Sequence, residues 1–170
     1  MDHQRIIENL QANLPVFREL LTNKSEKEYT WKPEQSKWCL LEIVCHLRDE
    51  EQEDFRTRVA YPLEDPTKPL PGIDPQGWVI EREYMKQDYN QVLNTFLDER
   101  RKSINFLRSL ENPSWKNTTE HPILGPLSAE HFLANWLAHD YLHVRQIEKL
   151  QHQYLAATSG IDLSYAGNIP

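Results

Sequence analysis

Cysteine, glycine and long apolar runs are all scarce in this sequence. Cys39 and Cys45 are the only cysteines, too few for a disulfide framework, which favours a reducing compartment. No apolar run approaches the roughly 18 residues that cross a bilayer, and the N-terminus is polar and charged where a secretory signal requires an apolar stretch. We therefore expect a cytoplasmic protein that does not associate with membranes.

Positive charge is also in short supply. The chain carries 19 Lys and Arg against 26 Asp and Glu, a formal net charge of -7. Nucleic-acid binding depends on basic surfaces that release counterions, and no basic stripe with interleaved aromatic residues is present. Nucleic acid is therefore not an expected partner. The acidic run at residues 48–54 is expected to form a solvated helix face.

The residues that are plentiful are those of a helical core. Hydrophobic residues make up 39% of the chain, with five Trp and five Phe, and helix-forming Leu, Glu, Gln, Lys and Arg are frequent. Its 170 residues suit one domain, residues 1–170, around one core. The absence of strand alternation predicts an all-α protein.

Hydrophobic periodicity predicts four helices. The first covers residues 2–22, with a kink at Pro15. The second covers residues 37–60 after an N-cap at Ser36, and the fourth runs from an N-cap at Ser128 to about Gln151. The third covers residues 77–110.

Prolines mark the longest connection. The segment 61–77 contains Pro62, Pro66, Pro69, Pro71 and Pro75 and is expected to be a long crossover within a four-helix bundle. Residues 112–127 are expected to form a second loop, and the residues after Tyr154 an irregular tail.

Three histidines lie on the predicted apolar stripes. His139 and His143 are four residues apart, which places their imidazoles on one face of a helix. His46 lies among the apolar residues of the second helix. Because buried imidazoles need hydrogen bonds or a ligand, the pattern predicts one divalent metal ion held by all three, with an open position for water or substrate.

Several segments resemble the DinB-like (YfiT-like) metalloenzyme superfamily. They are Trp31-Lys32-Pro33, Trp38-Cys39-Leu40-Leu41-Glu42-Ile43-Val44-Cys45-His46-Leu47, His121-Pro122-Ile123-Leu124-Gly125-Pro126-Leu127-Ser128, and His139-Asp140-Tyr141-Leu142-His143-Val144-Arg145-Gln146-Ile147. The resemblance implies a four-helix bundle with long crossover connections and an up-down-down-up course. It also implies that His46, His139 and His143 hold zinc or nickel, and that a homodimer is a common assembly.

Relatives in that superfamily use low-molecular-weight thiols, as S-transferases acting on bacillithiol or as mycothiol-dependent maleylpyruvate isomerases. His139 stands where the isomerase branch can have Glu, so this chain is nearer the YfiT and DinB side. The resemblance thus implies a metal-dependent S-transferase for a small-molecule substrate, with such a thiol as cosubstrate. Two alternatives stay open, a metal-dependent hydrolase and a non-enzymatic stress protein that binds a metal or a small ligand.

Other polar residues near the histidines have more than one interpretation. Glu42 and Glu50, four residues before and after His46, are either further ligands, a general base or solvated carboxylates. Asp140 is expected to form a salt bridge with a neighbouring helix. Gln146 either lines the pocket, or holds a hydrogen bond to a metal ligand, or is a surface or interhelical amide.

The remaining candidates are expected to play no part in the site. Cys39 is interpreted as a small buried residue, and His121 as an exposed loop residue. We expect surface positions for His3, His131 and His152.

Overall fold

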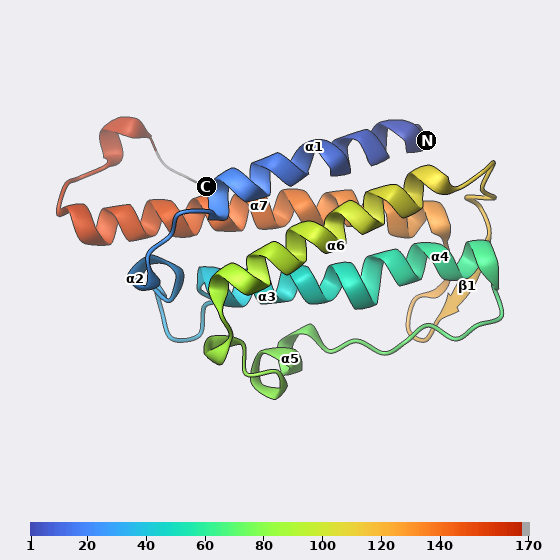
Figure 1. Cartoon of the computed structure of the whole chain (residues 1–170), viewed down its shortest axis with the longest axis horizontal. Helices are drawn as coiled ribbons and strands as arrows, with labels where there is room; N and C mark the ends of the chain where they lie inside the picture. The colour runs from blue at the N-terminus through green and yellow to red at the C-terminus, as the bar shows by residue number, and fades with distance from the viewer. Residues whose placement is uncertain (168–170) are drawn as a thin grey trace.

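The computed structural model of the chain describes residues 1–167, and within them four long helical rods lie side by side (Figure 1). The first rod is α1, His3–Leu21. The second is continuous and comprises α3, Leu40–Asp49, a π-helical segment, Glu50–Phe55, and α4, Arg56–Glu64. The third and fourth rods are α6, Tyr89–Ser109, and α7, Ala129–Ser159.

The shorter elements lie in the connections between the rods. They are α2, Glu26–Tyr29, α5, Pro75–Glu81, and the 3-10 turns Tyr84–Lys86 and Ser164–Ala166. A small antiparallel hairpin, β1 Thr118–His121 and β2 Gly125–Ser128, precedes α7.

The rods follow an up-down-down-up course. In Figure 1, α3 and α4 return along α1, the chain then crosses back, α6 runs in the same direction as α4, and α7 returns. α1 packs against α6 and α7, α3 packs against α6, and α4 packs against α7. The prediction of an all-α four-helix bundle with long crossover connections is confirmed.

Two apolar clusters fill the bundle, one toward each end. On α7, one cluster contains Phe132, Leu133, Trp136 and Leu137, and the other contains Ile147 and Leu150. On α6 the clusters use residues 89–97 and 104–107, and between them lie buried Glu99, Arg100 and Ser103. The second rod has the same order, because buried acidic residues between positions 49 and 54 separate its two apolar parts. A polar layer therefore crosses the middle of the bundle.

The predicted third helix is wrong as a single element. Instead of one helix over 77–110, α5 ends at Glu81, and Glu83 adopts a left-handed backbone conformation with φ of 46°. Asp88 then caps α6 by accepting a hydrogen bond from the backbone N–H of Gln91 at 2.7 Å. The break therefore comes from a strong N-cap inside the apolar pattern.

The ends of the second helix also differ from the prediction. It begins at Leu40 after Cys39, not after Ser36, because the Glu42 carboxylate accepts a hydrogen bond from the Cys39 backbone N–H at 2.9 Å. It continues through Pro62 to Glu64. The crossover is correspondingly shorter than 61–77.

The predicted loop and tail contain more regular structure than expected. Residues 118–128 form the hairpin, with Gly125 at φ of 74° where the chain turns back. The predicted N-cap Ser128 is confirmed, since its hydroxyl accepts from the His131 N–H at 3.2 Å. α7 extends beyond Gln151 to Ser159, and Tyr154 within this extension packs against Trp31.

Between Met1 and Gly167, no helix has the length and apolar character that crossing a membrane requires.

Candidate metal centre

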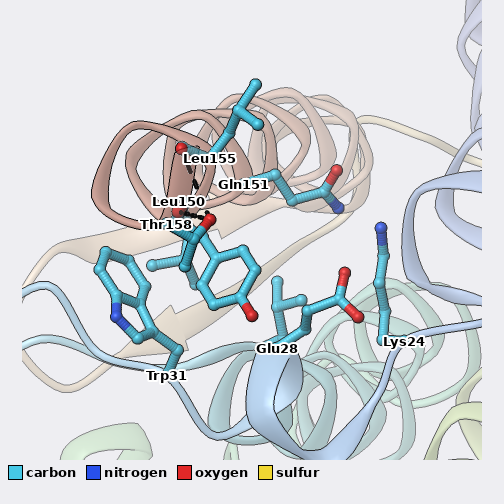
Figure 2. Close-up of a pocket in the computed structure, with 9 residues that line it drawn as sticks. Lys24, Glu28, Trp31, Leu150, Gln151, Leu155 and Thr158 are labelled. Atoms are coloured by element: carbon cyan, nitrogen blue, oxygen red, sulfur yellow. Dashed lines mark hydrogen bonds between the residues drawn. The ribbon is translucent and has the colours of Figure 1, made fainter. Parts of the chain in front are cut away.

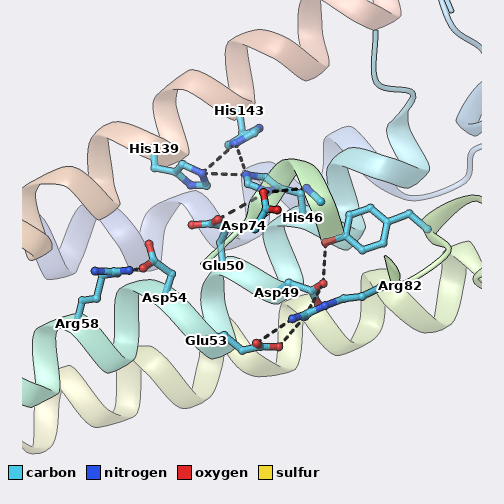
Figure 3. Close-up of polar contacts among 12 residues, drawn as sticks. His46, Asp49, Glu50, Glu53, Asp54, Arg58, Asp74, Arg82, His139 and His143 are labelled. Atoms are coloured by element: carbon cyan, nitrogen blue, oxygen red, sulfur yellow. Dashed lines mark hydrogen bonds and ion pairs between the residues drawn. The ribbon is translucent and has the colours of Figure 1, made fainter. Parts of the chain in front are cut away.

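Three imidazoles from two rods converge in the polar layer (Figure 3). His46 comes from α3, and His139 and His143 come from successive turns of α7. The Nε2 atom of His46 lies 3.2 Å from that of His139 and 3.1 Å from that of His143. The third Nε2–Nε2 distance, between His139 and His143, is 3.0 Å.

Burial keeps these imidazoles neutral. Desolvation, assisted by the neighbouring His143, lowers the pKa of His46 to about 3. The pKa of His139 lies well below its usual value, mainly because of burial and then because of the two other histidines. Burial also lowers the pKa of His143. At neutral pH each ring therefore has one nitrogen lone pair available.

The arrangement fits a divalent cation. The Nδ1 atoms of His46 and His143 are buried, and neither has a hydrogen-bond partner among residues 1–167. With the ring proton on Nδ1, each neutral imidazole has its lone pair on Nε2, and the three Nε2 atoms face one another. Tetrahedral ligands about 2.0–2.1 Å from a zinc ion lie about 3.3 Å apart, close to the spacing of this triangle. The donor set is one that zinc, nickel and related ions accept.

A cleft of about 370 Å³ opens beside His46 and His143. One wall is the segment before α3, including Lys37 and Trp38, and the opposite wall includes Gln146 of α7. The Trp38 indole lies against the His46 imidazole, with ring centroids 5.0 Å apart. A small molecule can therefore approach the histidines from solvent.

The cleft continues into a second cavity of about 390 Å³, which shares Lys37, Trp38 and Gln146 with it. Glu34 and Gln153 line this extension. Gln146 therefore lines the pocket, which is one of the roles predicted for it. Together the two cavities form a groove along α7 with both polar and apolar walls, and we call it the α7 groove.

The expectation of a solvated acidic face at residues 48–54 is wrong. Asp49, Glu50, Glu51 and Asp54 are all buried. Glu50 Oε1 lies 3.9 Å from Nδ1 of His46. Burial raises the pKa of Glu50 to about 7. The positive charge of Arg58 opposes this shift, and the negative charge of Asp49 adds to it. Glu50 is therefore neither solvated nor remote from the histidines.

Glu42 has a structural role at the start of α3. Its carboxylate is buried, accepts from Lys32 Nζ at 2.7 Å and caps α3 at Cys39. Both carboxylate oxygens are thus engaged away from the three histidines.

Asp140 forms the predicted salt bridge with a neighbouring helix. Its oxygens accept from the guanidinium of Arg100 on α6 at 2.6 and 2.7 Å. Arg100 also donates to Glu51 at 2.9 Å, and its positive charge contributes to the low pKa of His139. Arg100 was not predicted from the sequence, although it follows Phe96 by four residues and precedes Ile104 by four, on the buried face of α6.

Neither cysteine is suited to bind a cation at the histidines. Burial raises the pKa of Cys39 to about 11 and that of Cys45 to about 12, so both stay thiols at neutral pH. The Cys39 Sγ atom instead lies 3.5 Å from Met85 Sδ. Cys39 is a small buried residue, as predicted.

The other histidines lie outside the cluster. His121 Nδ1 accepts from the backbone N–H groups of Ile123 and Leu124, each at 3.2 Å, so it is half-buried in its turn and not exposed. His131 is exposed, as predicted. His3 and His152 are half-buried at the surface, and His3 contacts Glu130 at 2.9 Å and stacks on Trp115.

A separate apolar pocket of about 240 Å³ lies between α2 and the C-terminal part of α7 (Figure 2). Trp31, Leu150 and Leu155 contribute its apolar surface, and Lys24 and Glu28 stand at its edge. No histidine or cysteine is among the residues that line it. It therefore contributes nothing to the metal centre.

Comparison with known proteins agrees with the fold. Three solved chains match, among them YfiT from Bacillus subtilis, described as a probable metal-dependent hydrolase with an unusual four-helix bundle topology. The alignment has a TM-score of 0.79 and 17% sequence identity, and it covers 89% of this chain and 87% of YfiT. No curated protein matches the sequence. The sequence model of the DinB superfamily matches residues 9–147, and the chain belongs to that superfamily.

Proposed function

We propose that this protein is a divalent-metal-dependent transferase that activates a low-molecular-weight thiol for attack on an electrophilic small molecule. The observation that carries the proposal is the triangle of three neutral imidazoles at the edge of the α7 groove. His46, His139 and His143 are the ligands through Nε2, and zinc and nickel are the cations we expect. The description of YfiT as a probable metal-dependent hydrolase agrees with a metal-dependent function.

A divalent cation held by these three histidines would supply Lewis-acid chemistry and would lower the pKa of a bound thiol toward neutrality. The chain's own residues hold the rest of the molecule. Lys37 brings a positive charge to the groove, Gln146 offers an amide and Trp38 a flat apolar surface. An extended polar thiol with an anionic group, of the bacillithiol type, suits these walls.

Hydrolysis is the second candidate, and Glu50 is the observation that favours it. A carboxyl group with a pKa of about 7 beside a metal ligand has the proton affinity that a general base needs at neutral pH. The same three histidines serve either reaction. The difference is whether the groove receives a thiol or an ester or amide substrate.

The test begins with metal content. Protein purified without a His-tag or chelator is compared by elemental analysis with His143→Ala and with a control, His131→Ala, which alters an exposed histidine of the same helix. We expect about one metal ion in the wild type and the control, and a clear loss in His143→Ala. Equal metal in all three removes the site.

Activity then separates the candidates. Metal-loaded wild type is incubated with a panel of low-molecular-weight thiols plus an electrophile, and in parallel with a panel of esters and amides. Thiol-dependent turnover that His143→Ala abolishes supports the transferase. Turnover of esters alone supports the hydrolase, and binding without turnover in either panel supports a non-enzymatic metal- or ligand-binding protein.

A further inference from the structure

The acidic segment next to His46 contains five carboxylates, and four of them are held by arginines. Asp49 accepts from Arg48 at 2.6 Å, and Glu51 accepts from Arg100 at 2.9 Å. Glu53 and Asp54 pair with Arg82 and Arg58. Figure 3 shows several of these pairs lying away from the histidines. These four carboxylates are therefore already engaged.

Glu50 is the exception. Within the described part of the chain it accepts no hydrogen bond, although only 4% of its surface is exposed, and its one close polar contact is His46 Nδ1 at 3.9 Å. That Nδ1 atom is itself buried with no hydrogen-bond partner in residues 1–167. Two buried, complementary polar groups thus face each other across one helical turn of α3 (Figure 3).

Among residues 1–167, Glu50 is the only carboxylate that lies within 4.0 Å of a ring nitrogen of His46. Its Nε2 atom faces His139 and His143, and Trp38, which packs against the ring, has no acceptor. Asp49 is also bound by the Tyr84 hydroxyl at 2.7 Å and by Arg82 at 3.0 Å. Within the described part of the chain, Glu50 is therefore the carboxylate available to Nδ1.

We propose that Glu50 is a positioning residue that accepts the Nδ1 proton of His46 and thereby directs the Nε2 lone pair toward the metal. This inference rests on the proposed metal site. The Glu50 side chain has three rotatable bonds, and a movement of about 1 Å brings its carboxylate within the usual 2.7–3.2 Å of Nδ1. Carboxylates that hold metal-binding histidines in this way fix the tautomer and the ring orientation.

The first test measures metal affinity in Glu50→Gln and Glu50→Ala by chelator competition with zinc. We expect about 10–100-fold weaker binding in Glu50→Ala. Glu50→Gln keeps the shape and a neutral acceptor, so it should fold as the wild type and lose less affinity. The matched control is Glu53→Gln, the same change on an exposed carboxylate three residues on. Affinity within twofold of the wild type in both Glu50 variants overturns the proposal.

The second test needs no metal. Nitrogen-15 NMR of the metal-free protein at neutral pH reports which nitrogen of His46 carries the proton. We expect the Nδ1–H tautomer in the wild type and in Glu53→Gln, and a mixture of tautomers in Glu50→Ala. A His46 tautomer that Glu50→Ala leaves unchanged contradicts the role.

The two measurements also separate this inference from the proposed function. Wild type that binds no zinc removes the metal site, while the tautomer measurement still tests the contact between Glu50 and His46. If Glu50→Gln lowers kcat yet leaves zinc affinity and tautomer unchanged, Glu50 is a general base and the positioning role is wrong.

Discussion

Arg100 is the side chain through which the four rods share one polar network. It is almost fully buried and donates to Glu51 of the second rod and to Asp140 of α7. Asp140 also accepts from Asn13 of α1 at 3.0 Å. Burial of a guanidinium is tolerated because two carboxylates neutralise it and hydrogen bonds satisfy it. This network abuts His139, the residue before Asp140, and so supports the candidate metal centre.

Replacement of Arg100 by Met should be strongly destabilising. Met fills a similar volume but leaves two buried carboxylates without their counter-charge, which costs about 3–5 kcal/mol of unfolding free energy. Urea denaturation measures the loss. Arg101→Met is the control, because Arg101 is exposed and pairs with exposed Asp98, so its change should be within about 0.5 kcal/mol. Equal stability of the two variants would show that the network contributes little.

The metal-free protein should lose stability as the pH falls from 7 to 5. The three histidines have lowered pKa values when folded, so below their ordinary pKa of 6.5 the unfolded chain takes up protons that the folded chain does not. Well below pH 6.5, each histidine that stays neutral in the folded state contributes a slope of up to about 1.4 kcal/mol per pH unit. Glu50 acts in the opposite sense, because its folded pKa of about 7 is above its ordinary value. The destabilisation from the three histidines exceeds the stabilisation from Glu50, so the free energy of unfolding falls as the pH is lowered.

Urea denaturation across this pH range checks the expectation. A variant with Gln in place of His46, His139 and His143 removes the three titrating groups and should show a much flatter pH dependence. An equally steep fall in that variant would mean that other groups titrate.

Among the helices, periodicity located all four rods, but local caps decided their ends. The N-cap at Ser128 was predictable because this residue directly precedes the apolar stripe of α7. The break before α6 was missed because the stripe of Tyr89, Val92 and Leu93 joins smoothly to Trp78 in sequence, whereas the Asp88 cap and the left-handed Glu83 act locally. The hairpin has only four residues per strand, too few for a visible alternation.

Asp88→Ala tests this break by the sign of its effect. If Asp88 caps α6, its removal should cost about 1 kcal/mol, because the Gln91 N–H loses its acceptor. If the helix ran unbroken through residue 88, Ala would be the better helix former and the variant would gain stability. Thermal or urea unfolding gives the sign. Asp98→Ala, within α6 and exposed, should be neutral or slightly stabilising.

The acidic segment shows why part of the site could not be predicted. Composition favours a solvated face for residues 48–54, since charged residues are rarely buried without partners. The partners of Glu51 and Glu53 are Arg100 and Arg82, which lie far away in sequence and meet them only in the folded bundle. The histidines were accessible to prediction because apolar neighbours surround each of them along the chain. Their role as metal ligands stays a prediction.

Across the whole molecule, the polar layer lies between two apolar clusters that hold it from both sides. Phe55 packs near His139, with ring centroids 4.9 Å apart, and belongs to one cluster, while Leu47 next to His46 belongs to the other. The clusters supply most of the apolar burial, and the layer between them positions the histidines. A metal ion in this layer would join α3 to α7 across the bundle.

Zinc should therefore raise the thermal stability of the metal-free protein. A ligand that binds only the folded state, at 100 times its Kd, adds about 2.7 kcal/mol, which for 170 residues corresponds to about 5–10 °C in Tm. His143→Ala removes one of three ligands and should lose most of this shift, whereas His131→Ala should keep it. A shift of the same size in His143→Ala would place the stabilising zinc elsewhere on the chain. A shift lost equally in both variants would indicate that the substitutions act through the stability of α7 and not through a ligand, because only one of the two histidines faces the cluster.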